Sequence, residues 1–200
     1  MKLRHYQEAA KEAGWNHLRT REDNPCIVIP TGGGKSPLMA AMTSEAVEWG
    51  KRVLLLADRK ELLEQNSTRF KLTGEKFSLF SASVGTKSIR NDVIFATPLT
   101  VKGSVGKFDN KFCSIIMDES HLLTPTIINI IDSMRNHNPN LRVIGLTATP
   151  FSMNGGLLYQ IDENDKPVSQ NKAKDPYFKK LIYKLSARYL IDHGWLTPPV

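Results

Sequence analysis

The chain has 200 residues, of which 40% are hydrophobic and 24% charged, which is the composition of an ordinary globular protein. Its 27 basic and 20 acidic side chains give a formal net charge of +7, which permits contact with a polyanion without specifying one. No apolar run is long enough to span a bilayer, and Cys26 and Cys113 lack the spacing of a disulfide framework or a zinc site. We therefore expect a soluble, cytoplasmic protein without a membrane partner.

Short apolar runs alternate with segments of helical spacing. The apolar runs are Cys26–Ile29, Val53–Ala57, Val93–Ala96, Ser114–Met117 and Val143–Leu146. Strands lack polar alternation in this way when helices cover both faces of a parallel sheet. Apolar residues at three- and four-residue steps predict helices within 1–20, 39–49, 60–70 and 125–134. The alternation predicts an α/β fold, with a mostly parallel sheet and helices on both faces.

The region after residue 150 is less regular. Residues 152–175 are rich in Asn, Asp, Lys and Gly and lack periodicity, which predicts a long surface loop. Residues 176–193 regain apolar spacing, and Thr197–Val200, with the sequence TPPV, resembles a linker.

The first predicted strand runs directly into the sequence PTGGGKS at residues 30–36. Glycines let backbone N–H groups curve around a polyphosphate, and the N-terminus of a following helix adds partial positive charge. Lys35 would then reach the β- and γ-phosphates, and the Ser36 hydroxyl would bind Mg²⁺. The residues expected to bind ATP here are Thr31, Gly32, Gly33, Gly34, Lys35 and Ser36. The strict pattern has glycine at the position of Ile29, so the match is partial; the alternative is a glycine-rich turn without a ligand.

An acidic pair follows the predicted strand Ser114–Met117. A carboxylate at the carboxyl end of such a strand faces the crevice where ligands bind in open α/β sheets, so Asp118 is expected to hold Mg²⁺. Glu119 can orient and deprotonate an attacking water molecule. The alternative is an acidic helix cap.

Three ordered motifs together resemble the first RecA-like lobe of superfamily-two helicases of the DExH type. They are GGGKS at 32–36, DESH at 118–121 and TATP at 147–150. The resemblance covers nearly the whole chain and implies a RecA-like P-loop NTPase lobe that hydrolyses ATP with Mg²⁺. It also implies that Thr147 and Thr149 couple the ATP site to a nucleic-acid track, and that His121 joins that network.

Weaker matches add further site residues. The sequence LRHYQ at residues 3–7 resembles the adenine-reading segment of the family, which implies that Arg4 and Gln7 contact the nucleotide. Arg59, after the second predicted strand, and Thr97, after the third, resemble elements that contact the nucleic-acid backbone.

Residues 142–151 and 182–199 give the chain a likeness to bacterial RadD-type helicases of double-strand-break repair. This likeness implies sequence-independent binding of DNA, repair proteins as partners and a second RecA-like lobe. We expect residues 1–196 to be the first lobe and 197–200 to begin the linker to the second, so that the isolated lobe is weakly active. Asp58 and Arg59 depart from the RadD-type pattern, and the motor subunits of restriction enzymes share most of the same motifs.

Two further classes of function remain. A P-loop phosphotransferase would need an acceptor pocket and a lid in the same chain, and it leaves the TATP segment unexplained. A non-catalytic nucleotide-binding or docking module needs no combination of Lys35, Ser36, Asp118 and Glu119. The leading hypothesis is an ATP-binding lobe of a DNA-dependent ATPase or helicase, and the motor of a restriction enzyme is its alternative.

Overall fold

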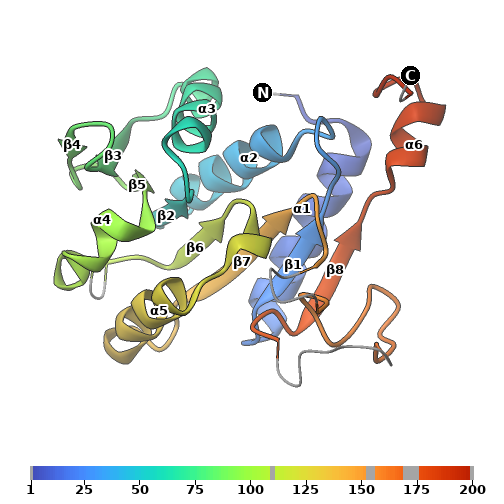
Figure 1. Cartoon of the computed structure of the whole chain (residues 1–200). Helices are drawn as coiled ribbons and strands as arrows, with labels where there is room; N and C mark the ends of the chain where they lie inside the picture. The colour runs from blue at the N-terminus through green and yellow to red at the C-terminus, as the bar shows by residue number, and fades with distance from the viewer. Residues whose placement is uncertain (1, 109–110, 152–155, 169–175, 199–200) are drawn as a thin grey trace.

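The computed structural model describes residues 2–108, 111–151, 156–168 and 176–198, in which eight strands form one sheet (Figure 1). The strand order is β4-β3-β5-β2-β6-β7-β1-β8, and every neighbouring pair is parallel except β3–β4. The strands are β1 (Pro25–Val28), β2 (Val53–Leu56), β3 (Phe77–Ser81), β4 (Thr86–Lys87), β5 (Val93–Ala96), β6 (Ser114–Met117), β7 (Arg142–Thr147) and β8 (Lys180–Lys184). The α-helices are α1 (His5–Thr20), α2 (Lys35–Glu48), α3 (Lys60–Phe70), α4 (Pro98–Lys102), α5 (Pro125–His137) and α6 (Ala187–Asp192).

Helices cover both faces of the sheet, as predicted. Tyr6 of α1, Met39 of α2 and Leu63 of α3 pack against one face, and Val101 of α4 and Ile131 of α5 pack against the other. All four residues of β1, β2, β5 and β6 are buried, which explains why these strands lack polar alternation. The five apolar runs are confirmed as β1, β2, β5, β6 and β7.

Three strands were not predicted. β3 and β4 lie at one edge of the sheet and β8 at the other, and none of the three is buried along its whole length, so their sequences mix apolar and polar residues. The apolar spacing of 176–193 divides into β8 and α6. The predicted surface loop is wrong in part, because Leu158 and Tyr159 are buried against the core. The rest of that prediction, at 152–155 and 169–175, lies outside the described residues.

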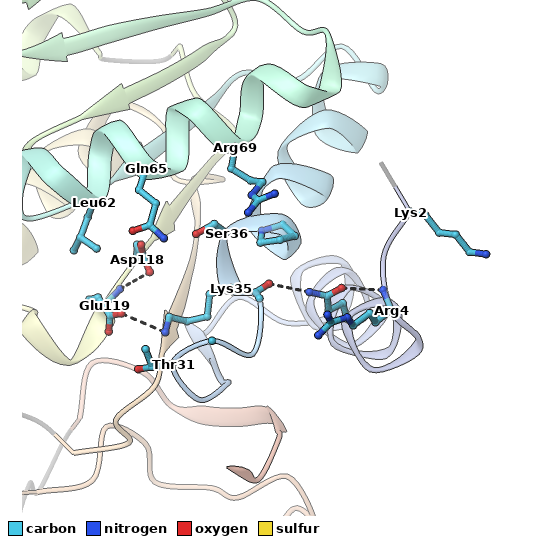
Figure 2. A pocket seen from close by; sticks show the side chains of 14 residues that line it. Lys2, Arg4, Thr31, Lys35, Ser36, Leu62, Gln65, Arg69, Asp118 and Glu119 are labelled. Carbon is cyan, nitrogen blue, oxygen red and sulfur yellow. Dashed lines mark hydrogen bonds and ion pairs between the residues drawn. The ribbon is translucent and has the colours of Figure 1, made fainter. Parts of the chain in front are cut away.

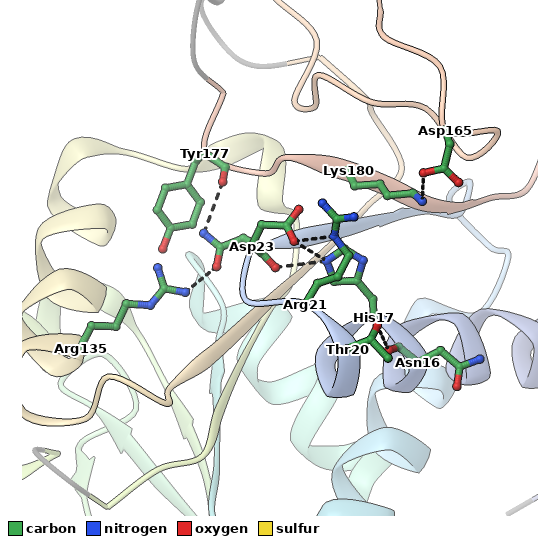
Figure 3. A network of polar contacts seen from close by, with 10 residues as sticks. Asn16, His17, Thr20, Arg21, Asp23, Arg135, Asp165, Tyr177 and Lys180 are labelled. Atoms are coloured by element: carbon green, nitrogen blue, oxygen red, sulfur yellow. Dashed lines mark hydrogen bonds and ion pairs between the residues drawn. The ribbon is translucent and has the colours of Figure 1, made fainter.

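A polar network holds the amino end of β1 (Figure 3). The Asn24 side chain accepts a hydrogen bond from Arg135 Nη2 (2.5 Å) and donates one to the Tyr177 carbonyl (3.3 Å). Nearby, His17 Nε2 lies 3.2 Å from the Asp23 carbonyl oxygen, and burial lowers the pKa of His17. These contacts join α1, α5 and the segment before β8 to the start of β1. They hold in place the amino end of β1, which is the end away from residues 30–36.

The strand order brings the sequence motifs together. β1, β7 and β6 are neighbours and run parallel, so their carboxyl ends lie side by side. The three motifs, at residues 30–36, 147–150 and 118–121, therefore meet at these strand ends. The Ile29 N–H donates to the Thr147 carbonyl (2.9 Å), which ties the start of the first motif to the third.

Within the described part of the chain, no helix has the length and apolar character needed to cross a membrane.

We expect Gly145→Ala to destabilise the fold. Gly145 lies in β7, where a Cβ would come within 2.6 Å of the Phe178 ring and 2.7 Å of Ser120 Cβ. Because the neighbouring side chains or the strand must shift to avoid these contacts, the free energy of unfolding should fall by about 1–3 kcal/mol, as measured by urea denaturation. Gly103→Ala is the matched control, since its Cβ would lie 3.9 Å from the Thr100 carbonyl oxygen, an ordinary contact. Equal losses in the two variants would contradict the prediction.

Candidate nucleotide-binding site

The loop after β1 has the geometry of a phosphate cradle. Gly32 (φ 78°) and Gly34 (φ 87°) have left-handed backbone conformations, and Gly34 is the N-cap of α2. Ile29, at the position where the strict motif has glycine, is buried in the core beneath the loop. A Cβ on Gly33 would lie 2.6 Å from Ile29 Cγ2, so the loop crosses directly over this side chain. Although the sequence matches the strict motif only in part, the loop still leads directly into the N-terminus of α2, where backbone N–H groups can bind an anion.

Gln7 joins the first helix to this loop. Its Oε1 accepts from the Arg4 N–H (2.8 Å), which caps α1, and its Nε2 donates to the Gly34 carbonyl (3.1 Å). Tyr6 also donates, to the Gly33 carbonyl (3.0 Å). A carboxamide has two donors and two lone pairs, so Gln7 retains one of each for a bound base.

Arg4 is held by an aromatic neighbour from the far end of the chain. Its guanidinium lies 5.2 Å from the centroid of the Trp195 ring, and its Nη1 is 3.0 Å from the Tyr6 hydroxyl. Trp195 packs on Tyr6 with ring centroids 4.9 Å apart. Trp195 thus positions a residue that is expected to bind nucleotide.

Asp118 is a buried carboxylate at the end of β6, only 6% exposed. It accepts hydrogen bonds from the Glu119 N–H (2.9 Å, to Oδ1) and from Asn66 Nδ2 (2.7 Å, to Oδ2). Burial raises the pKa of Asp118, and the Asn66 hydrogen bond and the Lys35 charge partly oppose that rise. A cation bound beside Asp118 would compensate the buried negative charge.

Glu119 lies at the centre of a chain of polar contacts. Its Oε1 is 3.3 Å from Lys35 Nζ, and its Oε2 is 3.2 Å from His121 Nδ1. His121 Nδ1 also lies 2.9 Å from the Thr147 hydroxyl. That hydroxyl also lies 3.1 Å from the Thr149 carbonyl, to which it can donate. Lys35, Glu119, His121 and Thr147, expected together from separate motifs, form one network.

Glu119 also has an unusual backbone conformation, with φ 47°. A left-handed residue other than glycine costs on the order of 1–3 kcal/mol and is characteristic of functional sites. The turn aims the carboxylate back at the phosphate loop, as Figure 2 shows.

These groups surround a cavity of about 530 Å³ (Figure 2). Its lining includes the predicted residues Arg4, Gln7, Thr31, Gly32, Gly34, Lys35, Ser36, Asp118 and Glu119, together with Lys2, Pro37, Leu62, Gln65 and Arg69. The Ser36 hydroxyl and the Asp118 carboxylate are hard oxygen donors, and Mg²⁺ in proteins is bound by few side chains because it keeps several water molecules. The donor set therefore fits Mg²⁺.

The sequence did not indicate the contribution of α3. Leu62, Gln65 and Arg69 line the cavity, and Asn66 of the same face contacts Asp118. The spacing of three, four and seven residues places these side chains together on a helix. The face could be recognised only when α3, which follows β2, was known to lie beside the end of β6.

Arg59 and Thr97 lie outside this cavity, after β2 and β5, which are neighbours in the sheet. Arg59 is exposed and is the N-cap of α3. The Thr97 hydroxyl is buried instead, since it donates to Ser81 (3.1 Å) and pairs with the Thr100 hydroxyl (2.9 Å).

Known proteins with similar sequences and structures share this architecture. The family described as "Type III restriction enzyme, res subunit" matches residues 1–152. The ATP-dependent DNA helicase mph1 of Sclerotinia sclerotiorum is 28% identical over 65% of this chain, which spans 12% of the helicase. The helicase domain of Pyrococcus furiosus Hef has a TM-score of 0.59 and 26% identity, covering 76% of this chain and 34% of that one. A nuclease-deletion mutant of the Type ISP restriction-modification enzyme LlaGI shares the fold, with a TM-score of 0.66, 17% identity and coverage of 98% and 18%.

The sheet, the motifs at its carboxyl edge and these relatives define an N-terminal lobe of the superfamily-two helicase type. The chain belongs to the family described as Type III restriction enzyme, res subunit, whose model matches residues 1–152.

We expect Asp118→Asn to stabilise the chain while damaging the site. The raised pKa means that the folded protein binds the Asp118 proton more tightly than the unfolded one, so the ionised carboxylate costs stability at neutral pH. Removing that charge should increase the free energy of unfolding by about 1 kcal/mol at pH 7, a stability–function trade-off. The Asn66 amide can rotate to accept from the new side chain.

The gain should shrink as the pH falls through the folded-state pKa of Asp118, because the wild-type carboxyl then becomes neutral. Thermal denaturation in EDTA from about pH 8 down to about pH 4, near the ordinary pKa of an aspartate, measures this dependence. Asp132→Asn, an exposed substitution on α5, should give no comparable gain. Equal stability of Asp118→Asn and wild type throughout this range would contradict the prediction.

Proposed function

We propose that residues 1–196 form the first RecA-like lobe of a DNA-dependent ATPase, with 197–200 beginning the linker to a second lobe. The observation that carries this proposal is the continuous contact from Lys35 through Glu119 and His121 to Thr147. It links groups suited to ATP hydrolysis with the element that follows β7. A phosphotransferase would have no use for the last two members.

The chain's own residues can perform distinct parts of the reaction. Backbone N–H groups of the glycine loop and Lys35 bind the phosphates, and Glu119 orients a water molecule and accepts its proton. Mg²⁺, held through Ser36 and Asp118, supplies neutralisation of phosphate charge when bound. A polyphosphate competes for Lys35, which frees the Glu119 oxygen that Lys35 contacts at 3.3 Å.

Thr147 and Thr149 would carry this change out of the site. The Thr149 N–H donates to the Thr147 hydroxyl (3.0 Å), and the Thr147 hydroxyl meets His121, so rearrangement of Glu119 alters the contacts of the segment after β7. We expect that segment to face the DNA track or the second lobe.

The proposed contacts with the DNA backbone are Arg59 and Thr97, which follow two adjacent parallel strands, β2 and β5, at the carboxyl ends of the strands, where the nucleotide site also lies. An exposed arginine can bind a phosphate in a bidentate way without reading sequence. The inward Thr97 hydroxyl would have to leave Ser81 and Thr100 to contact a phosphate.

We propose a role in DNA repair, with repair proteins as partners, in the manner of RadD-type helicases. The helicase names of the mph1 and Hef relatives support a DNA helicase. A restriction motor is the second candidate, favoured by the family that matches 1–152 and by the LlaGI fold. A nuclease or methyltransferase module in the same polypeptide or complex would decide for restriction.

We expect Glu119→Gln in the full-length protein to lower DNA-stimulated ATP turnover by about 10²–10⁴-fold with little change in KM for ATP, because it removes a general base and keeps the size of the side chain. Glu48→Gln, at the far end of α2 from Lys35, is the control and should retain wild-type turnover. The 200-residue chain alone should turn over slowly, since arginines supplied by a second lobe can contribute about 10³–10⁵ in rate. A full-length ATPase indifferent to DNA would overturn the proposed function.

We expect Arg59→Ala to weaken DNA binding equally for different sequences. Loss of one phosphate contact should reduce the slope of log K against log salt by about 1. The control is Arg188→Ala, which removes an exposed arginine of α6 that pairs with Asp192 (3.0 Å). Fluorescence anisotropy with two unrelated duplexes measures both slopes, and identical slopes for the two variants would refute a phosphate contact at Arg59.

A further inference from the structure

Asn66 is a buried amide directly beside the candidate magnesium site. It lies on α3, is 5% exposed, and donates from Nδ2 to Asp118 Oδ2 at 2.7 Å. Gln65 and Arg69 of the same helix line the nucleotide cavity. Asn66 lies behind these lining residues and reaches the site through its hydrogen bond to Asp118, although no sequence motif marks it.

The other end of this amide has no partner. Asn66 Oδ1 is buried and makes no hydrogen bond within the described part of the chain. An unsatisfied buried polar atom costs about 1–3 kcal/mol, so its presence in a native fold needs an explanation. Reversing the amide would not relieve the cost, because the oxygen would then face the Asp118 carboxylate. The carbonyl oxygen is thus committed to accepting from a donor that the described residues do not supply.

We propose that Asn66 is a positioning residue of the magnesium site, where Nδ2 orients the Asp118 carboxylate and Oδ1 accepts a hydrogen bond from a water molecule of the hydrated ion. The proposal rests on the proposed function, since it requires Mg·ATP to bind in this cavity. Mg²⁺ gives up its water reluctantly, and each bound water molecule is a donor. Partners of metal ligands contribute about 10–100-fold to metal affinity in well-studied sites.

The test separates nucleotide binding from the effect of the metal. A fluorescent, non-hydrolysable ATP analogue is titrated into the full-length protein in EDTA and at a series of Mg²⁺ concentrations. For Asn66→Ala, we expect affinity in EDTA to stay within about twofold of wild type, while the Mg²⁺ concentration that gives half of the enhancement rises about 10-fold. Ser67→Ala is the matched control, because this neighbouring buried hydroxyl bonds to the Glu64 carbonyl (3.1 Å).

A second variant guards against a merely structural effect. Asn66→Leu keeps the branching at Cγ, fills the space that alanine leaves empty and removes the unsatisfied oxygen. It also removes the donor to Asp118, as Asn66→Ala does, so its melting temperature in EDTA should exceed that of Asn66→Ala. It should nevertheless lose the Mg²⁺ enhancement to the same extent as Asn66→Ala. A structural role would instead make Mg²⁺ dependence follow stability.

The outcomes are distinguishable. Normal Mg²⁺ enhancement in both Asn66 variants, or an equal loss of affinity in EDTA and in Mg²⁺, would overturn the role of Asn66 while leaving the nucleotide site intact. If the wild-type protein binds the analogue neither in EDTA nor in Mg²⁺, the proposed function itself is overturned.

Discussion

The parallel placement of β6, β7 and β1 side by side is the constraint on which the site depends. Their register holds Ile116 opposite Ile144 and Ile27 opposite Leu146, so the three strands end at the same edge of the sheet. Each strand is a buried apolar segment followed by a polar motif. Because the backbone hydrogen bonds keep those ends together, side chains from three distant segments meet around one cavity.

Several features that cost stability lie at or beside the cavity. Asp118 keeps a buried carboxyl group whose pKa burial raises, Glu119 has a left-handed backbone, and Asn66 has an unsatisfied oxygen. Backbone strain and an orphaned polar atom each cost on the order of 1–3 kcal/mol. The fully buried strands on either side can support such costs, and each feature has a use in the binding of a polyphosphate and a hydrated cation that we propose. This is the usual exchange of stability for function.

Two structural connections end on adjacent residues of the site. One runs from Thr149 through Thr147 and His121 to Glu119, and the other runs along α3 from Arg59 to Asn66 and then to Asp118. The first reaches the proposed general base and the second the proposed metal ligand. Movement of either element that we propose to face nucleic acid would therefore affect a different part of the proposed hydrolytic chemistry.

The sequence alone was sufficient for features that depend on neighbouring residues. The glycine loop, the acidic pair and the central strands were predictable because neighbouring residues supply both the conformation and the chemistry. The unpredicted edge strands, the inward Thr97 hydroxyl and the pairing of Asn66 with Asp118 have no such local signal. They depend on which strands become neighbours and which helix face packs beside them. These choices are made by burial of the whole core, since contacts between residues 52 positions apart exist only after the sheet has formed.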